Sequence, residues 1–292
     1  MSNEPESQPI AGKTSRPWVG VLLAFFISGS AHFLAGNKRA GIVWFAIIAF
    51  FKLLAIGALG SSLIPGILPG IVLVVIAFAL WLSMLVKSCQ PVPRLRLFGW
   101  VIFMCVAAVL EISLSTGARF FFHPYSQPTG SMEPTIQGKH RQSDGTTTGG
   151  DHFFVEEYAY WFKKPARGDV IVYKNPDNFP SLAAGRLYIK RVAAIPGDIL
   201  SIHEGHLYNH GQPVTHPATL ANLVIMNPPN PTPQYLADSN SVFEVPAGQY
   251  FILGDNTLNS LDSRFVGTIS ETNILGKVSK IYWPLSRAGQ VQ

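Results

Sequence analysis

The sequence predicts two parts: an N-terminal α-helical transmembrane bundle of three or four spans, then a mostly antiparallel β domain. Three observations predict this fold class. Hydrophobic residues make up 48% of the chain, charged residues only 13%, and the mean hydropathy is +0.24. The apolar residues concentrate before residue 118, and the remainder has mixed charge with frequent Gly and Pro. We therefore expect a polar tail (1–17), a transmembrane helical domain (18–118) and a β domain (119–292).

Four apolar segments approach the length of about 20 residues that a helix needs to cross a bilayer. They cover residues 18–36, 40–59, 65–86 and 97–117. The first is interrupted by "SGSAH" (28–32), so it either crosses the bilayer or stays near one face. A cleaved signal peptide is the alternative for this segment, but three more apolar segments follow it. Three and four spans both remain open.

Two short loops hold the basic residues that orient the bundle: Lys38, Arg39, Lys87, Arg94 and Arg96. The loop at 60–66 has no charge. Because cytoplasmic loops are enriched in Lys and Arg, we expect both basic loops on the cytoplasmic side. Everything after residue 118 then lies on the extracytoplasmic side. The tail residues Lys13 and Arg16 favour the opposite orientation if there are four spans.

Two charged residues, Lys52 and Glu111, lie inside the apolar segments. Each could extend separately toward the membrane surface. However, Lys52 lies 12 residues into its segment and Glu111 lies 14 into its own, counted from the cytoplasmic ends. At about 1.5 Å per residue, their depths match within roughly 3 Å. We therefore predict an ion pair between the second and fourth segments.

The β domain is predicted from short runs of alternating or β-branched residues: "HFFVEEY", "DVIVYK", "LYIKRVAAI", "ILSIH", "HLYN", "YFILGD" and "GKVSKIYW". The net charge of +5 is mild, and no basic run is interleaved with aromatic residues. Nucleic acid is therefore not an expected partner. The lipid bilayer is an expected partner, because it accounts for the apolar segments.

We expect no metal and no cofactor. The two cysteines, Cys89 and Cys105, lie in or beside the apolar region, so the β domain has no disulfide. Four histidines fall within one short stretch: His203, His206, His210 and His216. Strand and turn residues separate them at irregular spacings, so surface or loop positions are favoured over a metal site.

The stretch "QPTGSMEPTI" (127–136) fixes the backbone around one serine. Pro128 and Pro134 flank Ser131, and proline restrains both its own φ and the residue before it. Such rigidity suits a nucleophile, although a solvated serine in a surface turn is the ordinary alternative. A nucleophilic hydroxyl needs a base, and "YIKRVAAIPGD" (188–198) offers Lys190.

Alternation in that run places Tyr188, Lys190 and Val192 on one face of a strand. On an apolar face, the lysine loses hydration, its pKa falls, and the neutral amine can act as a general base. The alternative is a lysine that points to water, and the pattern alone does not decide between them.

Four blocks in order resemble the type I signal peptidases, membrane-bound serine proteases with a Ser/Lys dyad: "PTGSMEPTI", "GDHFFVEEYAYW" with "RGDVIVY", "YIKRVAAIPGD" and "GDNTLNSLDSRFVGTI". The resemblance covers residues 119–284. It implies a catalytic β domain with a curved, partly barrel-like core, and cleavage of signal peptides from exported precursor proteins. It also implies an integral protein of a bacterial-type inner (plasma) membrane, with the catalytic domain on the extracytoplasmic side. The secretion machinery is a further candidate partner.

Position by position, the resemblance implies that Ser131 is the nucleophile and Lys190 the general base. It implies that the Thr129 hydroxyl and the Ser131 backbone N–H stabilise the oxyanion, and that Ser260 orients the lysine. Four supporting residues follow: an ion pair of Asp262 and Arg264, which we expect to share one face of a strand, and a structural turn at Gly254 and Asp255.

The chain departs from the family pattern at three places. A common lysine of the second block is replaced by Glu157 or its neighbour. Thr257 stands where the family usually has a basic residue. Residues 138–150 form an apparent insertion, rich in Gly, Thr and Ser, which we expect to be a mobile loop near the substrate. Two other functions stay open: a Ser/Lys peptidase dedicated to one client, and an inactive membrane-anchored binding module.

Overall fold

A computed structural model describes residues 17–60, 68–87, 97–141, 143, 145–175, 185–228 and 231–292. The described residues form two compact units: one holds 17–59, 68–87 and 97–118, and the other holds Gly60 and the described residues from 119 onward. Lys13, Arg16, Arg94, Arg96 and Cys89 lie outside the described residues, as does most of the loop at 60–66.

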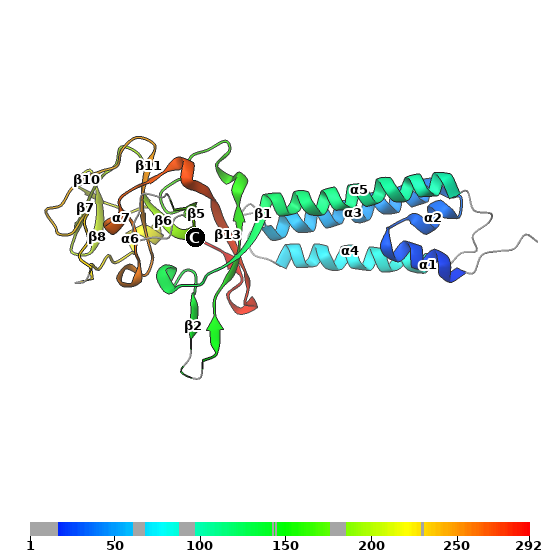
Figure 1. The fold of residues 1–292 in the computed structure, drawn as a ribbon, viewed down its shortest axis with the longest axis horizontal. Helices are drawn as coiled ribbons and strands as arrows, with labels where there is room; N and C mark the ends of the chain where they lie inside the picture. The colour runs from blue at the N-terminus through cyan, green and yellow to red at the C-terminus, as the bar shows by residue number, and fades with distance from the viewer. Residues whose placement is uncertain are drawn as a thin grey trace, which may run out of the picture. The chain divides into compact units, whose positions relative to one another are not determined.

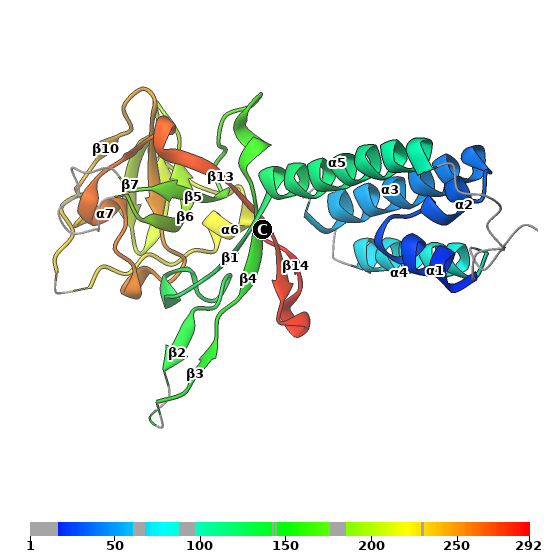
Figure 2. The same ribbon diagram turned by 45° about the vertical axis from the view of Figure 1, so that its right-hand side comes forward.

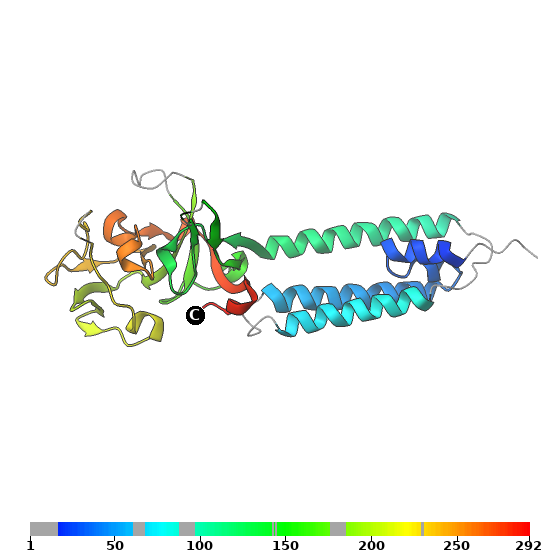
Figure 3. The same ribbon diagram turned by 90° about the horizontal axis from the view of Figure 1, so that it is seen from below.

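The first unit is entirely helical and is dominated by three long helices that run along one another (Figures 1 and 3). Its elements are α1 (Pro17–Phe26), α2 (Ser30–Leu34), α3 (Lys38–Gly60), α4 (Leu68–Lys87) and α5 (Leu97–Phe121). The last three match the predicted segments at 40–59, 65–86 and 97–117. Many apolar side chains of α3 and α4 are exposed, as expected for helices that face lipid.

The first predicted segment, 18–36, is not one helix. It is divided into α1 and α2, with 10 and 5 residues, at Gly29. Gly29 has φ +84°, and a Cβ there would lie 2.0 Å from the carbonyl oxygen of Gly41. The left-handed backbone and the close approach both require glycine, and they end α1. At about 1.5 Å per residue, α1 covers only about half of a bilayer core of about 30 Å.

Among the described residues, α3 and α4 are long and apolar enough to cross a membrane. Within α5, the described apolar stretch is Val101–Ser113, which is shorter. The structure thus gives two candidate spans, and the count of three or four stays a prediction.

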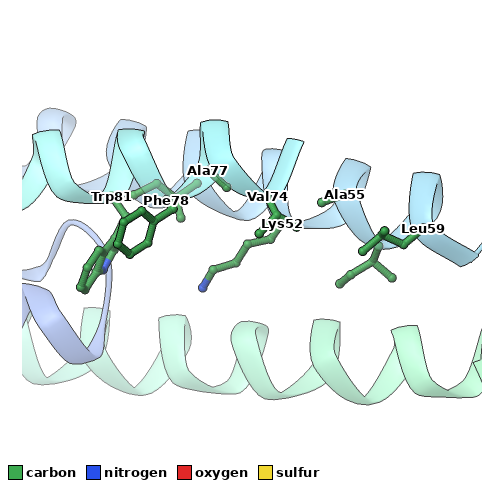
Figure 4. A pocket seen from close by; sticks show the side chains of 9 residues that line it. Lys52, Ala55, Leu59, Val74, Ala77, Phe78 and Trp81 are labelled. Carbon is green, nitrogen blue, oxygen red and sulfur yellow. The ribbon is translucent and has the colours of Figure 1, made fainter. Parts of the chain in front are cut away.

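The predicted ion pair between Lys52 and Glu111 is confirmed: Lys52 Nζ contacts Glu111 Oε1 and joins α3 to α5. Beside the pair lies a mostly apolar cavity of about 450 Å³, lined by residues of α3 and α4 that include Leu59, Phe78 and Trp81. Figure 4 shows the Lys52 side chain extending from α3 toward α5. The ion pair therefore links α3 to α5.

The second unit is built on antiparallel strands (Figure 2), which confirms the predicted β domain. Its largest sheet has the order β1-β4-β13-β5-β6-β11-β12, and β14 pairs with β13. The strands of this sheet are β1 (Phe122–Ser126), β4 (His152–Glu156), β5 (Val170–Lys174), β6 (Leu187–Ala194), β11 (Gln249–Leu253), β12 (Ile269–Ser270), β13 (Ile274–Trp283) and β14 (Gly289–Gln290).

Two smaller sheets complete the unit. One has the order β10-β7-β8-β9, from β7 (Ile199–His203), β8 (His206–Asn209), β9 (Gln212–Pro213) and β10 (Phe243–Glu244). The other pairs β2 (Lys139–Arg141) with β3 (Thr147–Gly149). The insertion at 138–150 is therefore a two-stranded ribbon that projects from the unit, not an irregular loop (Figure 2). Short helices connect the strands: α6 (Ala218–Ala221), α7 (Ser263–Val266), η1 (Gly130–Met132), η2 (Glu157–Tyr160), η3 (Thr257–Asn259), η4 (Glu271–Asn273) and η5 (Leu285–Arg287).

Alternation along β5 separates two apolar cores on the two faces of the large sheet. Val170 and Val172 pack in a cluster that includes Met132. Ile171 and Tyr173 pack in a second cluster, on the opposite face. The first cluster thus anchors the segment that follows Ser131 against the sheet.

Candidate active site

Ser131 lies in the short helix η1, where the chain is held on several sides. Its side chain is buried, with 8% of the residue exposed, and the neighbouring Met132 is fully buried. The Asn256 backbone N–H donates to Ser131 O at 3.1 Å, and Asn256 Nδ2 donates to Gly130 O at 3.2 Å. The predicted rigidity is therefore present, and it comes from these contacts as well as from the flanking prolines.

Lys190 projects from β6 onto Ser131. Its Nζ donates to Ser131 Oγ at 2.9 Å and to Ile189 O at 3.0 Å. Tyr188 and Val192 pack in one apolar cluster, as the predicted alternation requires. Only 3% of Lys190 is exposed, so the lysine points into the protein and not to water.

Burial lowers the pKa of Lys190 from 10.5 to about 8, because a charged ammonium loses its hydration there. The carboxylates of Asp262 and Asp255 act in the opposite direction and raise the pKa, but burial is the larger effect. A large share of the amine is therefore neutral near pH 8. A neutral amine within hydrogen-bond distance of a buried hydroxyl can remove its proton.

Thr129 directs its hydroxyl toward the same point. Thr129 Oγ1 lies 3.5 Å from Ser131 Oγ. Gln127 Nε2 donates to Thr129 O at 2.8 Å and to Thr129 Oγ1 at 3.3 Å, which fixes the residue. The Thr129 hydroxyl is thus held beside Ser131 Oγ.

Ser260 makes no hydrogen bond to Lys190 in this structure. Its Oγ is buried and makes no hydrogen bond. It lies against Gly254, where a Cβ would be 2.2 Å from Ser260 Oγ and 2.6 Å from Ser131 O. Only glycine fits at 254, and this close approach brings Ser260 beside the segment that carries Ser131. The hydrogen bond from Ser260 that would orient the lysine is not made here.

Asp262 and Arg264 form the predicted ion pair, but not on a strand. Asp262 caps the N-terminus of α7, and both side chains are fully buried. Arg264 Nε donates to Asp262 Oδ1 at 2.9 Å and Nη2 donates to Oδ2 at 3.0 Å. Asp262 Oδ2 also accepts from Gly254 N at 3.0 Å. The i, i+2 spacing was misread as a strand face because it also fits a capping residue and the second residue of a helix.

Asp255 has a partner that the sequence did not indicate. Arg191 Nε and Nη2 donate to the two carboxylate oxygens of Asp255 at 2.8 and 2.7 Å. Arg191 Nη1 also donates to Gly168 O and Gln292 O. This fully buried arginine fastens the strand that carries Lys190 to the turn at 254–255.

Thr257, the departure from the family pattern, is buried and has a structural part. Its Oγ1 donates to Val224 O at 3.0 Å, and its backbone oxygen accepts from Arg264 Nη2 at 2.7 Å. Sequence reasoning missed the contributions of Asn256, Arg191 and Gln127. All three lie inside or beside the motif blocks, and this position in the sequence could have indicated that they belong to the site.

A cleft of about 420 Å³ opens beside Ser131. The described residues that line it are Tyr125, Ser126, Gln127, Pro128, Thr129, Ser131, Val172, Arg186, Leu187, Tyr188, Ile189 and Lys190. Two stretches of extended backbone therefore form its walls, one before Ser131 and one before Lys190. In the part of the chain that the structure describes, no three His, Cys, Asp or Glu side chains gather as a metal site would require.

The family model and the curated relatives point to one family. The family model "Signal peptidase, peptidase S26" matches residues 97–283. A probable signal peptidase I-1 from Synechocystis sp. is 35% identical over 191 residues, which covers 64% of this chain and 83% of that protein. A signal peptidase I from Leptolyngbya laminosa is 32% identical over 187 residues, with 62% and 79% covered. A solved signal peptidase I from Enterococcus faecalis V583 is 24% identical with a TM-score of 0.30, and the match covers 40% of this chain and 98% of that chain.

Proposed function

This chain belongs to the signal peptidase family, peptidase S26, and we propose that it works through Ser131 as nucleophile and Lys190 as general base. The chain is a serine endopeptidase that cleaves signal peptides. Its substrates are secreted precursors that carry them. The contact of 2.9 Å between Lys190 Nζ and Ser131 Oγ carries the proposal.

In the proposed reaction, the neutral amine of Lys190 accepts the Ser131 proton while Oγ attacks the scissile carbonyl. Lys190 then returns the proton to the leaving amine, and an acyl-enzyme remains on Ser131. Lys190 next removes a proton from the water that attacks the ester, and it returns that proton to Ser131 Oγ as the second product leaves. The lowered pKa supports this role, because only the neutral amine can accept a proton. No metal or cofactor takes part in these steps.

The Thr129 hydroxyl and the Ser131 backbone N–H are the proposed oxyanion donors. The position of Thr129 Oγ1, 3.5 Å from Ser131 Oγ, supports this assignment. Removing one such preorganised donor typically slows turnover by a hundredfold or more, or about 3–4 kcal/mol.

Ser260 and the buried pair of Asp262 and Arg264 are proposed to support the reacting groups. Ser260 Oγ has no partner and stands beside the Ser131 segment, so it is available to accept from the ammonium that forms when Lys190 is protonated. The pair holds the turn at Gly254 through Asp262 Oδ2. Asp255 acts through Arg191 to fix the strand of Lys190.

The cleft beside Ser131 is proposed to receive the substrate as an extended strand. Backbone segments on both sides offer hydrogen-bonding groups, and Val172 and Ile189 provide apolar surface for small side chains. Residues before the cut, with an A-x-A-like pattern, would occupy this cleft.

We further propose an integral protein of a bacterial-type inner membrane, with residues 18–118 in the membrane and 119–292 as an extracytoplasmic catalytic domain. Two helices of suitable length and composition support membrane anchoring, and α5 is the proposed third span. The basic residues Lys38 and Lys87 support a cytoplasmic position for the start of α3 and the end of α4. The bilayer and the secretion machinery are the proposed further partners.

Cleavage of a purified A-x-A precursor by the full-length chain in detergent tests this function. We expect Ser131→Ala and Lys190→Ala to abolish cleavage while both variants keep the wild-type circular dichroism spectrum. Cleavage that survives in either folded variant would contradict the assigned residues. Precursors that accumulate on depletion would separate a general peptidase from one dedicated to a single client.

A further inference from the structure

Arg186 places a positive charge in the cleft beside Ser131. It lines that cleft together with Ser131 and Lys190. None of the described residues that line the cleft is acidic. Lys190 is buried and largely committed to Ser131, so Arg186 is the cation that an incoming substrate would meet.

The Arg186 guanidinium has no protein partner among the described residues. The residue is exposed, and its backbone oxygen accepts from Asn175 N at 2.9 Å. Arg191, five residues further on, instead spreads its guanidinium over Asp255 and two backbone oxygens. Most exposed arginines are simply solvated, but Arg186 lines the cleft that holds Ser131. The five N–H donors of the planar Arg186 guanidinium are therefore available to a ligand.

The spacing between Arg186, which directly precedes β6, and Lys190 gives the position that Arg186 would reach. Arg186 lies four residues before Lys190. An extended chain rises about 3.3 Å per residue, so the two Cα positions are about 13 Å apart. A substrate bound as a strand advances at the same rate. Arg186 would then lie opposite a residue about four or five positions from the cut.

We propose that Arg186 is a specificity-determining residue that favours signal peptides with a carboxylate about four or five residues before the cleavage site. This inference rests on the proposed function, which places the residues before the cut in this cleft. A guanidinium binds a carboxylate through two parallel N–H donors, and a lysine substrate residue would be repelled. Because the site is exposed to solvent, the preference is moderate, about two- to fivefold in kcat/KM.

Matched peptides test the inference with the purified full-length chain in neutral detergent. Each peptide contains the same A-x-A site and carries Glu, Gln or Lys at one position, three to six residues before the cut. The readout is the ratio of kcat/KM for the Glu peptide to that for the Lys peptide. We expect this ratio to exceed one at the fourth or fifth position in the wild type, to persist in Arg186→Lys and to invert in Arg186→Glu.

Lys164→Gln is the matched control, because Lys164 is an exposed cation that pairs with Glu271 and does not line the cleft. It should leave the ratio unchanged. A wild-type ratio of one at every position, or an unchanged ratio in Arg186→Glu, would overturn the inference while cleavage of the Gln peptides upholds the proposed function. If Arg186→Gln alters only binding to phosphatidylglycerol vesicles and not the ratio, the partner is a lipid headgroup and the inference also fails. No cleavage of any peptide by folded wild type would reject the proposed function itself.

Discussion

At the scale of single residues, the burial of Lys190 supplies a neutral amine for the reaction but lowers the stability of the fold. Burial lowers its pKa from 10.5 to about 8, and each pKa unit corresponds to about 1.4 kcal/mol. Below pH 8 the ammonium is more stable in the unfolded chain, so burial there costs about 3 kcal/mol of folding free energy. Between pH 8 and 10.5 the unfolded chain binds more protons than the folded one. Stability from this residue therefore rises with pH across that window.

Replacing this lysine by an apolar residue of similar length should stabilise the fold. We expect Lys190→Met to raise the free energy of unfolding at pH 7 by about 3 kcal/mol, with a difference that shrinks toward pH 10.5. Thermal unfolding of the full-length chain in detergent, followed at several pH values, measures it. A variant that melts below the wild type at pH 7 would argue that the ammonium is well solvated or well paired in the folded protein.

At the scale of elements, the buried pair at the start of α7 holds the turn at Gly254 and the backbone of Thr257. Arg264 donates to Asp262, to the backbone oxygens of Met226 and Thr257, and to Asn227 Oδ1. Removing the arginine alone leaves a buried carboxylate without its cation, which typically costs 3–5 kcal/mol.

We therefore expect Arg264→Met to lower the free energy of unfolding by about 3–5 kcal/mol. Lys164→Met is the control, because the exposed pair of Lys164 and Glu271 should contribute no more than about 1 kcal/mol. Denaturant titration of both variants in detergent gives the comparison. Equal and small effects in the two variants would mean that the buried pair does not stabilise this turn.

The presence of a helix or a strand was predictable where the same hydrophobic periodicity extended over many residues. The long apolar helices and the alternating strands, such as β5 and β6, follow from hydrophobic spacing alone. The break at Gly29 falls inside the interruption that "SGSAH" predicted, but its cause, the close approach to Gly41, was not visible in the sequence. The capping position of Asp262 was not predictable, because it depends on packing against Gly254. The ribbon at 138–150 was read as a loop since Gly and Thr favour turns, whereas pairing of Lys139 with Gly149 overrides that preference. In the site, the contacts of Arg191 join residues from four separate segments, and spacing in one chain does not reveal them.

At the scale of the whole molecule, the proposed function requires the helical unit to lie in the membrane and the β unit to lie on the extracytoplasmic side. Cysteine labelling in intact cells tests this orientation after Cys89 and Cys105 are replaced by Ala. We expect a membrane-impermeant maleimide to label His206→Cys from outside, because His206 is exposed in the β unit. Arg39→Cys should be labelled only after the cells are opened. The reverse pattern would place the β unit in the cytoplasm.

The account depends on a neutral amine at position 190 that activates the hydroxyl at position 131. The pH dependence of kcat/KM for an A-x-A peptide tests this most directly. Since only the neutral amine accepts the proton, we predict that kcat/KM rises through an ionisation near pH 8 and levels off above it. A profile that is flat from pH 6 to 10, or that falls as pH rises through 8, would contradict the claim.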